Sequence, residues 1–294
     1  MTAPIGIVGQ GAWGSALAAS LRSSGTEVVP WRRGDRPDSL GHCDIALLAV
    51  PAQATRQVLT ELTEGLDPAT MLVLTAKGLE TETYLRQSQI VMQVAPGHPV
   101  AVLSGPSFAA DLSKGLPTAV ALATEIEQAE TLQRRLATPS LRPYLTADVI
   151  GVELGGALKN VIAIACGVTI GAGLGESARA ALMARGFAEI VRIGKASGAQ
   201  AATLSGLGGL GDLVLTSTSD LSRNFRYGRA LGAEGRAPKA GTYEGVATAE
   251  AALRLSQSLG LDCPIIATVA ALVQGRCSVQ EAIRALYSRP LRRE

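Results

Sequence analysis

Two lysines and one aspartate stand in segments of this sequence where charged side chains are unusual, and together they could move a proton. Lys159 lies within the apolar run Val149–Leu174, where an ammonium group is costly unless it is paired. Burial, together with a second cation such as Lys77, would lower the pKa of Lys159 toward neutral pH, which suits a general acid or base. Asp212, in a glycine-rich predicted turn, could orient the ammonium. The alternative is a structural lysine whose stem lies along the helix.

A second group of polar residues could recognise an anionic small molecule. Residues 104–107 read Ser-Gly-Pro-Ser, and the backbone N–H groups of this predicted turn, with the Ser107 hydroxyl, could bind an anion or hydroxyl groups. Arg223 adds a guanidinium that fits two phosphate oxygens, and Asn224 adds an amide with two donors. The pair favours a phosphorylated small substrate, although Arg-Asn is also an ordinary surface-loop sequence.

The nucleotide-binding signal lies at the start of the chain. Residues 9–14 read Gly-Gln-Gly-Ala-Trp-Gly, directly after the apolar run Ile5–Val8 and before a helical pattern. In this setting Gly9 permits a tight turn, Gly11 lets the backbone approach a pyrophosphate, and Gly14 lets the helix pack closely on the strand. The helix N-terminus offers N–H groups to the phosphates. A glycine-rich turn without a ligand is the alternative.

The cofactor is indicated by the end of the second predicted strand, which reads Trp31-Arg32-Arg33. An NAD-binding protein usually places an acidic residue near this position to hold the ribose 2′-hydroxyl. Here Asp35 comes only afterwards, in a predicted turn. Because arginine suits a 2′-phosphate, the sequence favours NADP(H), with NAD(H) as the alternative cofactor. A solvated loop is the alternative role for the arginines.

The elements that must position these residues begin with an alternation of short apolar runs and helical segments, which predicts a doubly wound parallel sheet. The predicted strands are Ile5–Val8, Glu27–Trp31, Asp44–Val50, Met71–Thr75, Val100–Leu103 and Ala119–Leu122. The predicted helices between them include Ser15–Arg22, Ala52–Glu61 and Ile126–Leu136. Because ligands gather at the carboxyl ends of such strands, Pro51, Lys77 and the 104–107 turn should surround one cleft.

From about Asp148 the pattern becomes helical. The predicted helices are Val149–Ala165, Ala178–Ala196, Thr248–Leu259 and Ile265–Val273, with glycine-rich turns at 171–173 and 206–209. We therefore predict an α/β fold in which residues 1–147 form a Rossmann-type dinucleotide-binding domain and residues 148–294 form an all-α substrate and catalytic domain. On the first of these helices, Glu153 and Asn160 are seven residues apart and should share a face, with Lys159 adjacent.

Composition excludes several other classes of protein. The 294 residues are 47% hydrophobic and 18% charged, which fits a compact globular chain. The net charge of +2 comes with no basic tract for nucleic acid, and Arg289, Arg292 and Arg293 predict a solvated tail. His42 and His98 lie in predicted loops without partners that would suggest a metal site.

The sequence also favours a cytoplasmic protein without a membrane anchor. The apolar run Val149–Leu174 contains Glu153, Lys159 and Asn160, which a lipid-facing helix would carry at a cost, so a buried helix is expected. The first residues lack the basic segment of a signal peptide. The cysteines lack C-x-x-C spacing and fit a reducing compartment; they are Cys43, Cys166, Cys263 and Cys277.

Taken together, these segments resemble the bacterial NAD(P)-dependent glycerol-3-phosphate dehydrogenase family. The resemblance runs in order from Gly9 to Thr248, over most of the chain. The segments that are specific in combination are Lys77–Glu80, Ser104–Ala109, Gly156–Asn160 and Arg223–Asn224. The resemblance implies reversible reduction of dihydroxyacetone phosphate to sn-glycerol 3-phosphate, in support of glycerophospholipid synthesis. It also implies an enzyme without a metal ion and, by analogy, a homodimer.

The resemblance further implies roles for individual residues. Lys159 would be the catalytic lysine, assisted by Lys77 and Asp212. The implied substrate-binding residues are Lys77, Gly105, Ser107, Lys159, Asn160, Asp212, Thr216, Ser222, Arg223 and Asn224. The implied cofactor-binding residues are Gly9, Gly11, Ala12, Trp13, Gly14, Arg32, Arg33, Lys77, Ala109, Arg223, Thr242 and Glu244.

Two features depart from the family pattern. The connection from Arg32 to Cys43 is shorter than the helical segment that family members usually carry there. This shortening affects the contacts expected at the adenosine end of the cofactor. Ala52 stands where the family commonly has serine.

Two rival functions are set against this interpretation. A 3-hydroxyacid or 6-phosphogluconate-type dehydrogenase shares the two-domain plan, but tends to space its lysine and asparagine about one helical turn apart, whereas Lys159 and Asn160 are adjacent. A non-catalytic NADPH-binding regulator, which fold alone would allow, should lack Lys77, Lys159 or Asp212.

Overall fold

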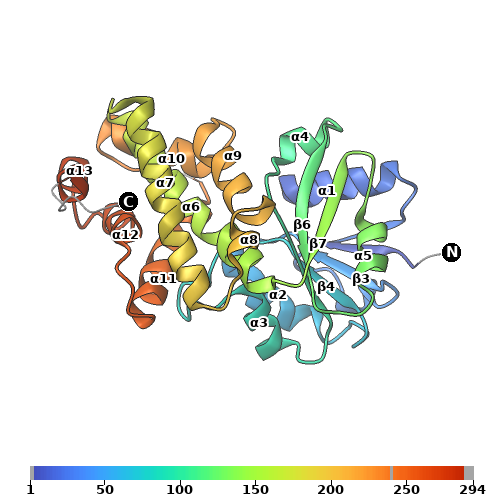
Figure 1. Ribbon diagram of the computed structural model, residues 1–294. Helices are drawn as coiled ribbons and strands as arrows, with labels where there is room; N and C mark the ends of the chain where they lie inside the picture. Colours follow the sequence, from blue (N-terminus) through green and yellow to red (C-terminus); the bar gives the residue numbers. More distant parts are fainter. Residues whose placement is uncertain (1–2, 239–240, 288–294) are drawn as a thin grey trace.

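The computed structural model describes residues 3–238 and 241–287 of the chain. The sheet and its helices form one end of the molecule, and a group of helices forms the other (Figure 1). The three arginines predicted to form a tail, Arg289, Arg292 and Arg293, lie outside the described residues.

The sheet occupies the first half of the chain. Its strands are β1 (Ile5–Val8), β2 (Val28–Trp31), β3 (Ile45–Leu48), β4 (Met71–Leu74), β5 (Val100–Ser104), β6 (Thr118–Ala123) and β7 (Leu141–Thr146). Their order is β2-β1-β3-β4-β5-β6-β7, and the first five strands in this order, β2 to β5, are parallel to one another. The predicted α/β fold with a doubly wound sheet is therefore confirmed.

The sheet differs from the prediction at its far end. The expectation of a wholly parallel sheet is wrong, because β6 runs antiparallel to β5. The connection between them holds only α4 (Ala109–Ser113), which packs on α1 (Ala12–Ser23) and does not cross back over the sheet. The strand β7 was not expected, since it is an edge strand that alternates buried Leu141 and Pro143 with exposed Arg142 and Tyr144 and so lacks an apolar run.

Helices cover both faces of the sheet. One face packs against α1, α4 and α5 (Ala129–Leu136), and the other packs against α2 (Thr55–Leu62) and α3 (Gln87–Val94). Because both faces are covered, the strands β1 and β3 are buried throughout, as their continuous apolar runs predict. The carboxyl ends of the parallel strands point toward the helical part of the molecule (Figure 1).

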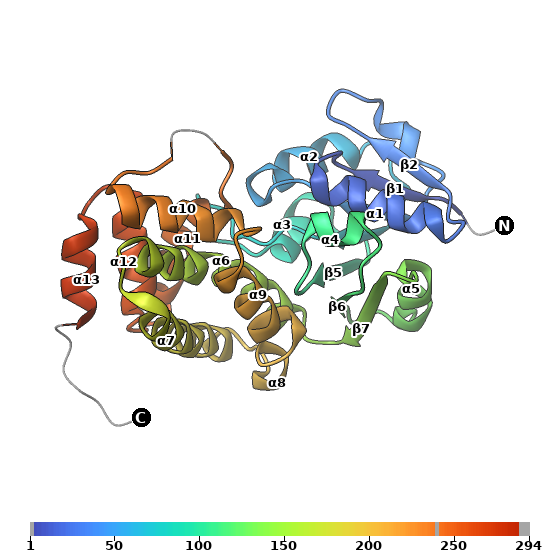
Figure 2. The same cartoon turned by 90° about the horizontal axis from the view of Figure 1, so that it is seen from above.

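The helical part is built around α6 (Val149–Gly171). The other helices are α7 (Gly175–Ala196), α8 (Ala201–Leu204), α9 (Asp212–Thr218), α10 (Arg223–Glu234), α11 (Glu244–Ser258), α12 (Pro264–Val273) and α13 (Val279–Tyr287). Figure 2 shows α6 running between α10 and α7. The helix α6 is long and apolar enough to cross a membrane, but 89% of its most apolar window is buried inside the protein. The expected buried helix is confirmed and extends beyond Ala165 to Gly171.

Two segments that the sequence predicts as turns or loops are helical. Leu207–Gly211 forms a π-helical turn that continues directly into α9, so Asp212 begins a helix. Arg223 and Asn224 begin α10 and do not lie in a loop. The backbone of this π-helical turn lies so close to α6 that a Cβ at Gly155 of α6 would collide with residues 208–209.

The helices α6 and α10 cross with their backbones in contact. Gly167 and Gly171 of α6 face α10, and Gly228 and Gly232 of α10 face α6. A Cβ on any of these glycines would collide with the backbone of the opposite helix, at Ile164 in the case of Gly228. This crossing fixes the first turn of α10 beside the middle of α6, where Asn160 lies.

We expect Gly228→Ala to destabilise the protein, because overpacking a close contact costs about 1–3 kcal/mol. On an exposed helix the same change would stabilise the protein by up to about 1 kcal/mol. A lower free energy of unfolding would therefore show that α6 and α10 are in close contact at this position. Urea unfolding followed by circular dichroism measures this. An unchanged or raised free energy of unfolding would show that the two helices can separate without cost.

Candidate active site

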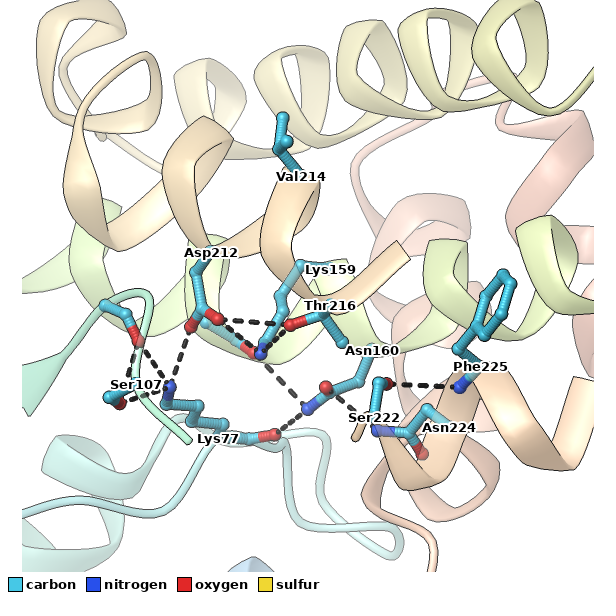
Figure 3. A network of polar contacts seen from close by, with 12 residues as sticks. Lys77, Ser107, Lys159, Asn160, Asp212, Val214, Thr216, Ser222, Asn224 and Phe225 are labelled. Carbon is cyan, nitrogen blue, oxygen red and sulfur yellow. Dashed lines mark hydrogen bonds and ion pairs between the residues drawn. The ribbon is translucent and has the colours of Figure 1, made fainter. Parts of the chain in front are cut away.

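The residues expected to do chemistry come together where the sheet meets the helices (Figure 3). Lys77 lies in the loop after β4, and Gly105 and Ser107 lie in the turn after β5. Lys159 and Asn160 come from α6, and the other members come from the starts of α9 and α10. The carboxyl ends of the strands therefore face a set of helical side chains, as the doubly wound fold requires.

Asp212 is held between two lysines. Its Oδ2 accepts a hydrogen bond from Lys77 Nζ at 2.7 Å, and its Oδ1 accepts one from Lys159 Nζ at 2.6 Å. Lys159 also donates to the Thr216 hydroxyl at 2.6 Å, and this hydroxyl lies 3.1 Å from Asp212 Oδ1. Asp212 is 1% exposed and Lys159 is 5% exposed. Two ammonium groups thus face a single carboxylate in a site almost closed to water.

The pKa values follow from this arrangement. Burial lowers the pKa of Lys159 from 10.5 to about 8; Asp212 opposes this shift and Lys77 adds to it. Burial alone would raise the pKa of Asp212, but the two lysines outweigh it and hold the pKa of this carboxyl below its usual value. The lowering that the sequence suggested for Lys159 is present, with the two expected causes. The lysine is therefore able to exchange a proton near neutral pH.

The loop that carries Lys77 is fixed from both sides. The ammonium of Lys77 donates to the carbonyl of Gly105 at 2.7 Å and lies 3.4 Å from the Ser107 hydroxyl. The carbonyl of Lys77 accepts a hydrogen bond from Asn160 at 2.9 Å. Gly105 has φ +153°, and a Cβ there would lie 2.9 Å from the backbone of Val120, so this position requires glycine.

A chain of amides links Asn160 to two further helices. Asn224 donates to Asn160 Oδ1 at 2.9 Å and accepts from the backbone N–H of Gly245 at 3.0 Å. Both side chains are buried. The expectation that the Asn224 amide offers two donors to a phosphate is wrong, because one of these donors is already used by Asn160. The amides instead hold the starts of α10 and α11 against α6.

The neighbours of Asn224 have different environments. Ser222 is the buried N-cap of α10, where its hydroxyl oxygen accepts the N–H of Phe225 at 3.2 Å. Arg223 is exposed, and its charge acts on the half-buried Glu244. Glu244 accepts the backbone N–H of Ala52 at 3.2 Å, which connects α11 to the loop after β3. Of these residues, Arg223 presents a charged side chain to solvent.

Glu153 lies on the same face of α6 as Asn160 and binds the sheet part of the molecule. Glu153 accepts hydrogen bonds from Arg86 at 2.6 Å and from both the backbone N–H and the hydroxyl of Ser88 at 2.7 Å. The shared face expected for Glu153 and Asn160 is confirmed. Arg86 and Ser88 were missed by the sequence analysis, although a carboxylate in so apolar a helix signals a partner of this kind.

The glycine segment has the conformation that a dinucleotide site requires. Gly9 has φ +98°, and a Cβ at Gly14 would collide with the carbonyl oxygen of Gly9. A Cβ at Gly11 would meet nothing within 4 Å, which leaves space beside the backbone. Within the described chain, no side chain caps the N-terminus of α1, so its N–H groups remain available to a pyrophosphate. These residues fit a dinucleotide.

The other residues expected at the cofactor lie around this segment. Ala12 is exposed and Trp13 is half-buried at the start of α1, and Ala109 begins α4, which packs on α1. Arg32 and Arg33 are exposed at the end of β2, and Thr242 is exposed just before α11. Within residues 3–238 and 241–287, no group of three or more His, Cys, Asp or Glu side chains could hold a metal ion.

Comparisons with known proteins identify the family. Residues 34–130 match the family model described as NAD-dependent glycerol-3-phosphate dehydrogenase N-terminus, and residues 148–284 match the model of its C-terminus. Among similar proteins is the glycerol-3-phosphate dehydrogenase [NAD(P)+] of Cereibacter sphaeroides, with 51% identity over 99% of this chain and 100% of the relative. The protein of the same name from Roseobacter denitrificans is 47% identical over 99% of each chain.

A solved structure supports the same conclusion. The match to the crystal structure of glycerol-3-phosphate dehydrogenase from Coxiella burnetii covers 98% of this chain and 99% of the Coxiella chain, with 33% identity and a TM-score of 0.93. These matches favour the expected family over the hydroxyacid dehydrogenase and regulator alternatives. The resemblance carried by the lysines, the 104–107 turn and the Arg223–Asn224 pair is confirmed, and this chain belongs to the NAD-dependent glycerol-3-phosphate dehydrogenase family.

Proposed function

We propose that this protein reduces dihydroxyacetone phosphate to sn-glycerol 3-phosphate with NAD(P)H, reversibly, and thereby supplies glycerophospholipid synthesis. The observation that carries the proposal is the buried carboxylate of Asp212 between Lys77 and Lys159. This arrangement puts a proton donor and a fixed positive charge at one point, which is what the reduction of a ketone requires. These three side chains lie at the carboxyl ends of the strands, where a doubly wound fold binds dinucleotides.

A nicotinamide cofactor held at the glycine segment of residues 9–14 would supply the hydride for the carbonyl carbon of the ketone. Lys159 donates its proton to the carbonyl oxygen, and Lys77 stabilises the negative charge that grows on this oxygen. Asp212 keeps both ammonium groups in place, with Thr216 as the second acceptor for Lys159. The remaining contacts to the substrate are proposed for Gly105, Ser107, Asn160, Ser222, Arg223 and Asn224.

Arg223 is the residue that we propose to hold the substrate phosphate. Its guanidinium is exposed at the start of α10, and a guanidinium binds phosphate oxygens in pairs. Besides the contacts proposed for them, Asn160 and Asn224 also position Arg223, because their amide chain anchors the first turn of α10 on α6. Holding the phosphate fixes the carbonyl between cofactor and lysines, which is an orientation effect.

For the cofactor we propose contacts with Gly9, Gly11, Ala12, Trp13 and Gly14 at the pyrophosphate. Further proposed contacts are made by Arg32, Arg33, Lys77, Ala109, Arg223, Thr242 and Glu244. The exposed Arg32 and Arg33 support a preference for NADPH over NADH. We also propose that residues 1–147 serve as the cofactor-binding domain and residues 148–294 as the substrate domain, in a cytoplasmic homodimer without a membrane anchor.

The proposal is tested by following NADPH oxidation by the purified protein on addition of dihydroxyacetone phosphate, with NADH in a parallel reaction. Rapid turnover with NADPH and slow turnover with NADH is the expected result. Equal rates with both cofactors would contradict the preference for NADPH and leave the reaction intact. No turnover with either cofactor would contradict the reaction itself.

The lowered pKa of Lys159 predicts opposite pH dependences for the two directions. Reduction needs the protonated lysine, so kcat/KM for the ketone should fall as the pH rises through about 8. Oxidation of glycerol 3-phosphate needs the neutral lysine, so its rate should rise through the same range. Initial rates of reduction and of oxidation are measured between about pH 6 and 10, which spans the titration of Lys159. A reduction rate that stays constant up to the normal lysine pKa would contradict the assignment.

A further inference from the structure

A closed turn, residues 32–35, directly follows β2. The backbone N–H of Asp35 donates to the carbonyl of Arg32 at 2.9 Å, and Asp35 Oδ2 accepts the backbone N–H of Arg32 at 2.7 Å. Gly34 has φ +92°, a conformation that glycine adopts without strain in such a turn. Two reciprocal hydrogen bonds between Arg32 and Asp35 therefore close a turn that is only four residues long.

The turn is attached to the glycine segment by the backbone. The N–H of Gly9 donates to the carbonyl of Trp31 at 3.0 Å, one residue before the turn begins. The strands β1 and β2 pair in parallel register up to Val8 and Trp31. The orientation of the turn is therefore defined relative to Gly11 and the start of α1, where the fold binds a pyrophosphate.

The arginines in and beside this turn differ in whether they form ion pairs. Arg36, just after the turn, forms an ion pair with Asp38 at 2.6 Å, and both side chains are exposed. In the part of the chain that the structure describes, the guanidinium groups of Arg32 and Arg33 have no ion pair or hydrogen bond, and both are exposed. Two free guanidinium groups therefore extend from the turn that Asp35 closes.

We propose that Asp35 is a positioning residue for cofactor choice, whose carboxylate closes the turn that presents Arg32 and Arg33 to the 2′-phosphate of NADPH. An acidic residue near the end of this strand usually accepts the ribose hydroxyls and so favours NADH. Here the carboxylate is occupied by the backbone N–H of Arg32. This inference rests on the proposed function, since it concerns the cofactor of that reaction.

If Asp35 acted through its charge and not by closing the turn, its removal would change 2′-phosphate binding in the opposite direction. If Asp35 acted only through its negative charge, it would repel the 2′-phosphate, and its removal would strengthen binding. If it acts by closing the turn, removal weakens binding, because the arginines lose their fixed position. A loosened turn also gives the arginines other partners, since the cavity of about 430 Å³ beside the turn is lined by Glu61 and Glu64.

Three variants separate these explanations. Asp35→Ala removes both the charge and the hydrogen-bond acceptor, whereas Asp35→Asn removes the charge and keeps an acceptor for the Arg32 N–H. Asp38→Ala removes the neighbouring charge and leaves the turn closed. Calorimetry with adenosine 2′,5′-bisphosphate, and with 5′-AMP as the probe that lacks the 2′-phosphate, measures the dissociation constants without any need for turnover.

We expect Asp35→Ala to weaken binding of the bisphosphate by about fivefold, the equivalent of one hydrogen bond, and to change 5′-AMP binding by less than about twofold. Asp35→Asn and Asp38→Ala should bind the bisphosphate at least as tightly as the parent. Unchanged or tighter binding by Asp35→Ala would overturn the inference, as would a loss in Asp35→Asn equal to that in Asp35→Ala. A parent protein that binds the bisphosphate but does not oxidise NADPH with the ketone would contradict the proposed function alone.

Discussion

Lys159→Met should lower kcat for ketone reduction by about 10²–10⁴-fold, the range that a general acid contributes. Methionine nearly reproduces the length of the lysine and removes its proton and charge. The remaining site should stay folded, because Asp212 keeps its ion pair with Lys77 at 2.7 Å and can accept a hydrogen bond from Thr216. The loss should therefore fall on kcat, with little change in the dissociation constant of NADPH.

The measurement is steady-state NADPH oxidation at saturating ketone, together with thermal unfolding to show that the variant is folded. Lys195→Met is the matched control, since it makes the same replacement at an exposed position near the end of α7. The residual rate of Lys159→Met should also lose the pH dependence near pH 8 that the buried lysine introduces. Near-full turnover in this variant would show that another group donates the proton.

Sequence patterns predict this fold well where one element carries its own signal. The glycine segment between an apolar run and a helix specifies the turn after β1, and Gly9 and Gly14 have the conformation and packing that it requires. The apolar length of α6 likewise predicts a buried helix. The strand β7 carries no such signal, because it lies at the edge of the sheet, where its exposed residues interrupt the apolar pattern.

The sequence predicts which residues come together in the candidate site, and it predicts their hydrogen-bond and ion-pair partners less well. A lysine in an apolar helix requires a counter-charge, which points to an acid such as Asp212, but sequence alone does not show that Lys77 shares it. Contacts between distant segments, such as Asn160 with Asn224 or Glu153 with Arg86, depend on how α6 and α10 cross and how α6 meets the sheet. These are tertiary outcomes for which short-range patterns carry no information.

Asp212→Asn should damage the site more broadly than Lys159→Met, because it leaves two ammonium groups together in a buried site without a carboxylate. The asparagine oxygen can accept from one lysine, but its NH₂ group then faces the other lysine as a second donor. Removing one partner of a buried ion pair costs about 3–5 kcal/mol, so we expect a clear loss of stability. The control is Asp220→Asn, at an exposed carboxylate that pairs with Arg229.

The same change should move the pH profile in a direction that a purely structural defect would not. Asp212 raises the pKa of Lys159 against the effects of burial and Lys77, so its loss should lower that pKa to below about 8. Reduction would then decline at lower pH than in the parent, and kcat at neutral pH would fall with it. Spectrophotometric rates across the pH range measure this shift. A profile that kept its midpoint would show that Asp212 does not control the charge of Lys159.

In the double variant Lys159→Met, Asp212→Asn the effects of the two changes on the free energy of unfolding should not be additive. Removing Lys159 from the Asp212→Asn protein takes away one of the two unpaired buried cations, so the double variant should be more stable than Asp212→Asn alone. Urea unfolding of the parent, both single variants and the double variant gives the coupling free energy between the residues. Additive losses would mean that the ion pair seen at 2.6 Å contributes nothing that either residue lacks on its own. A positive coupling would establish Asp212 as the residue that makes a buried, protonated Lys159 tolerable, and hence available for catalysis.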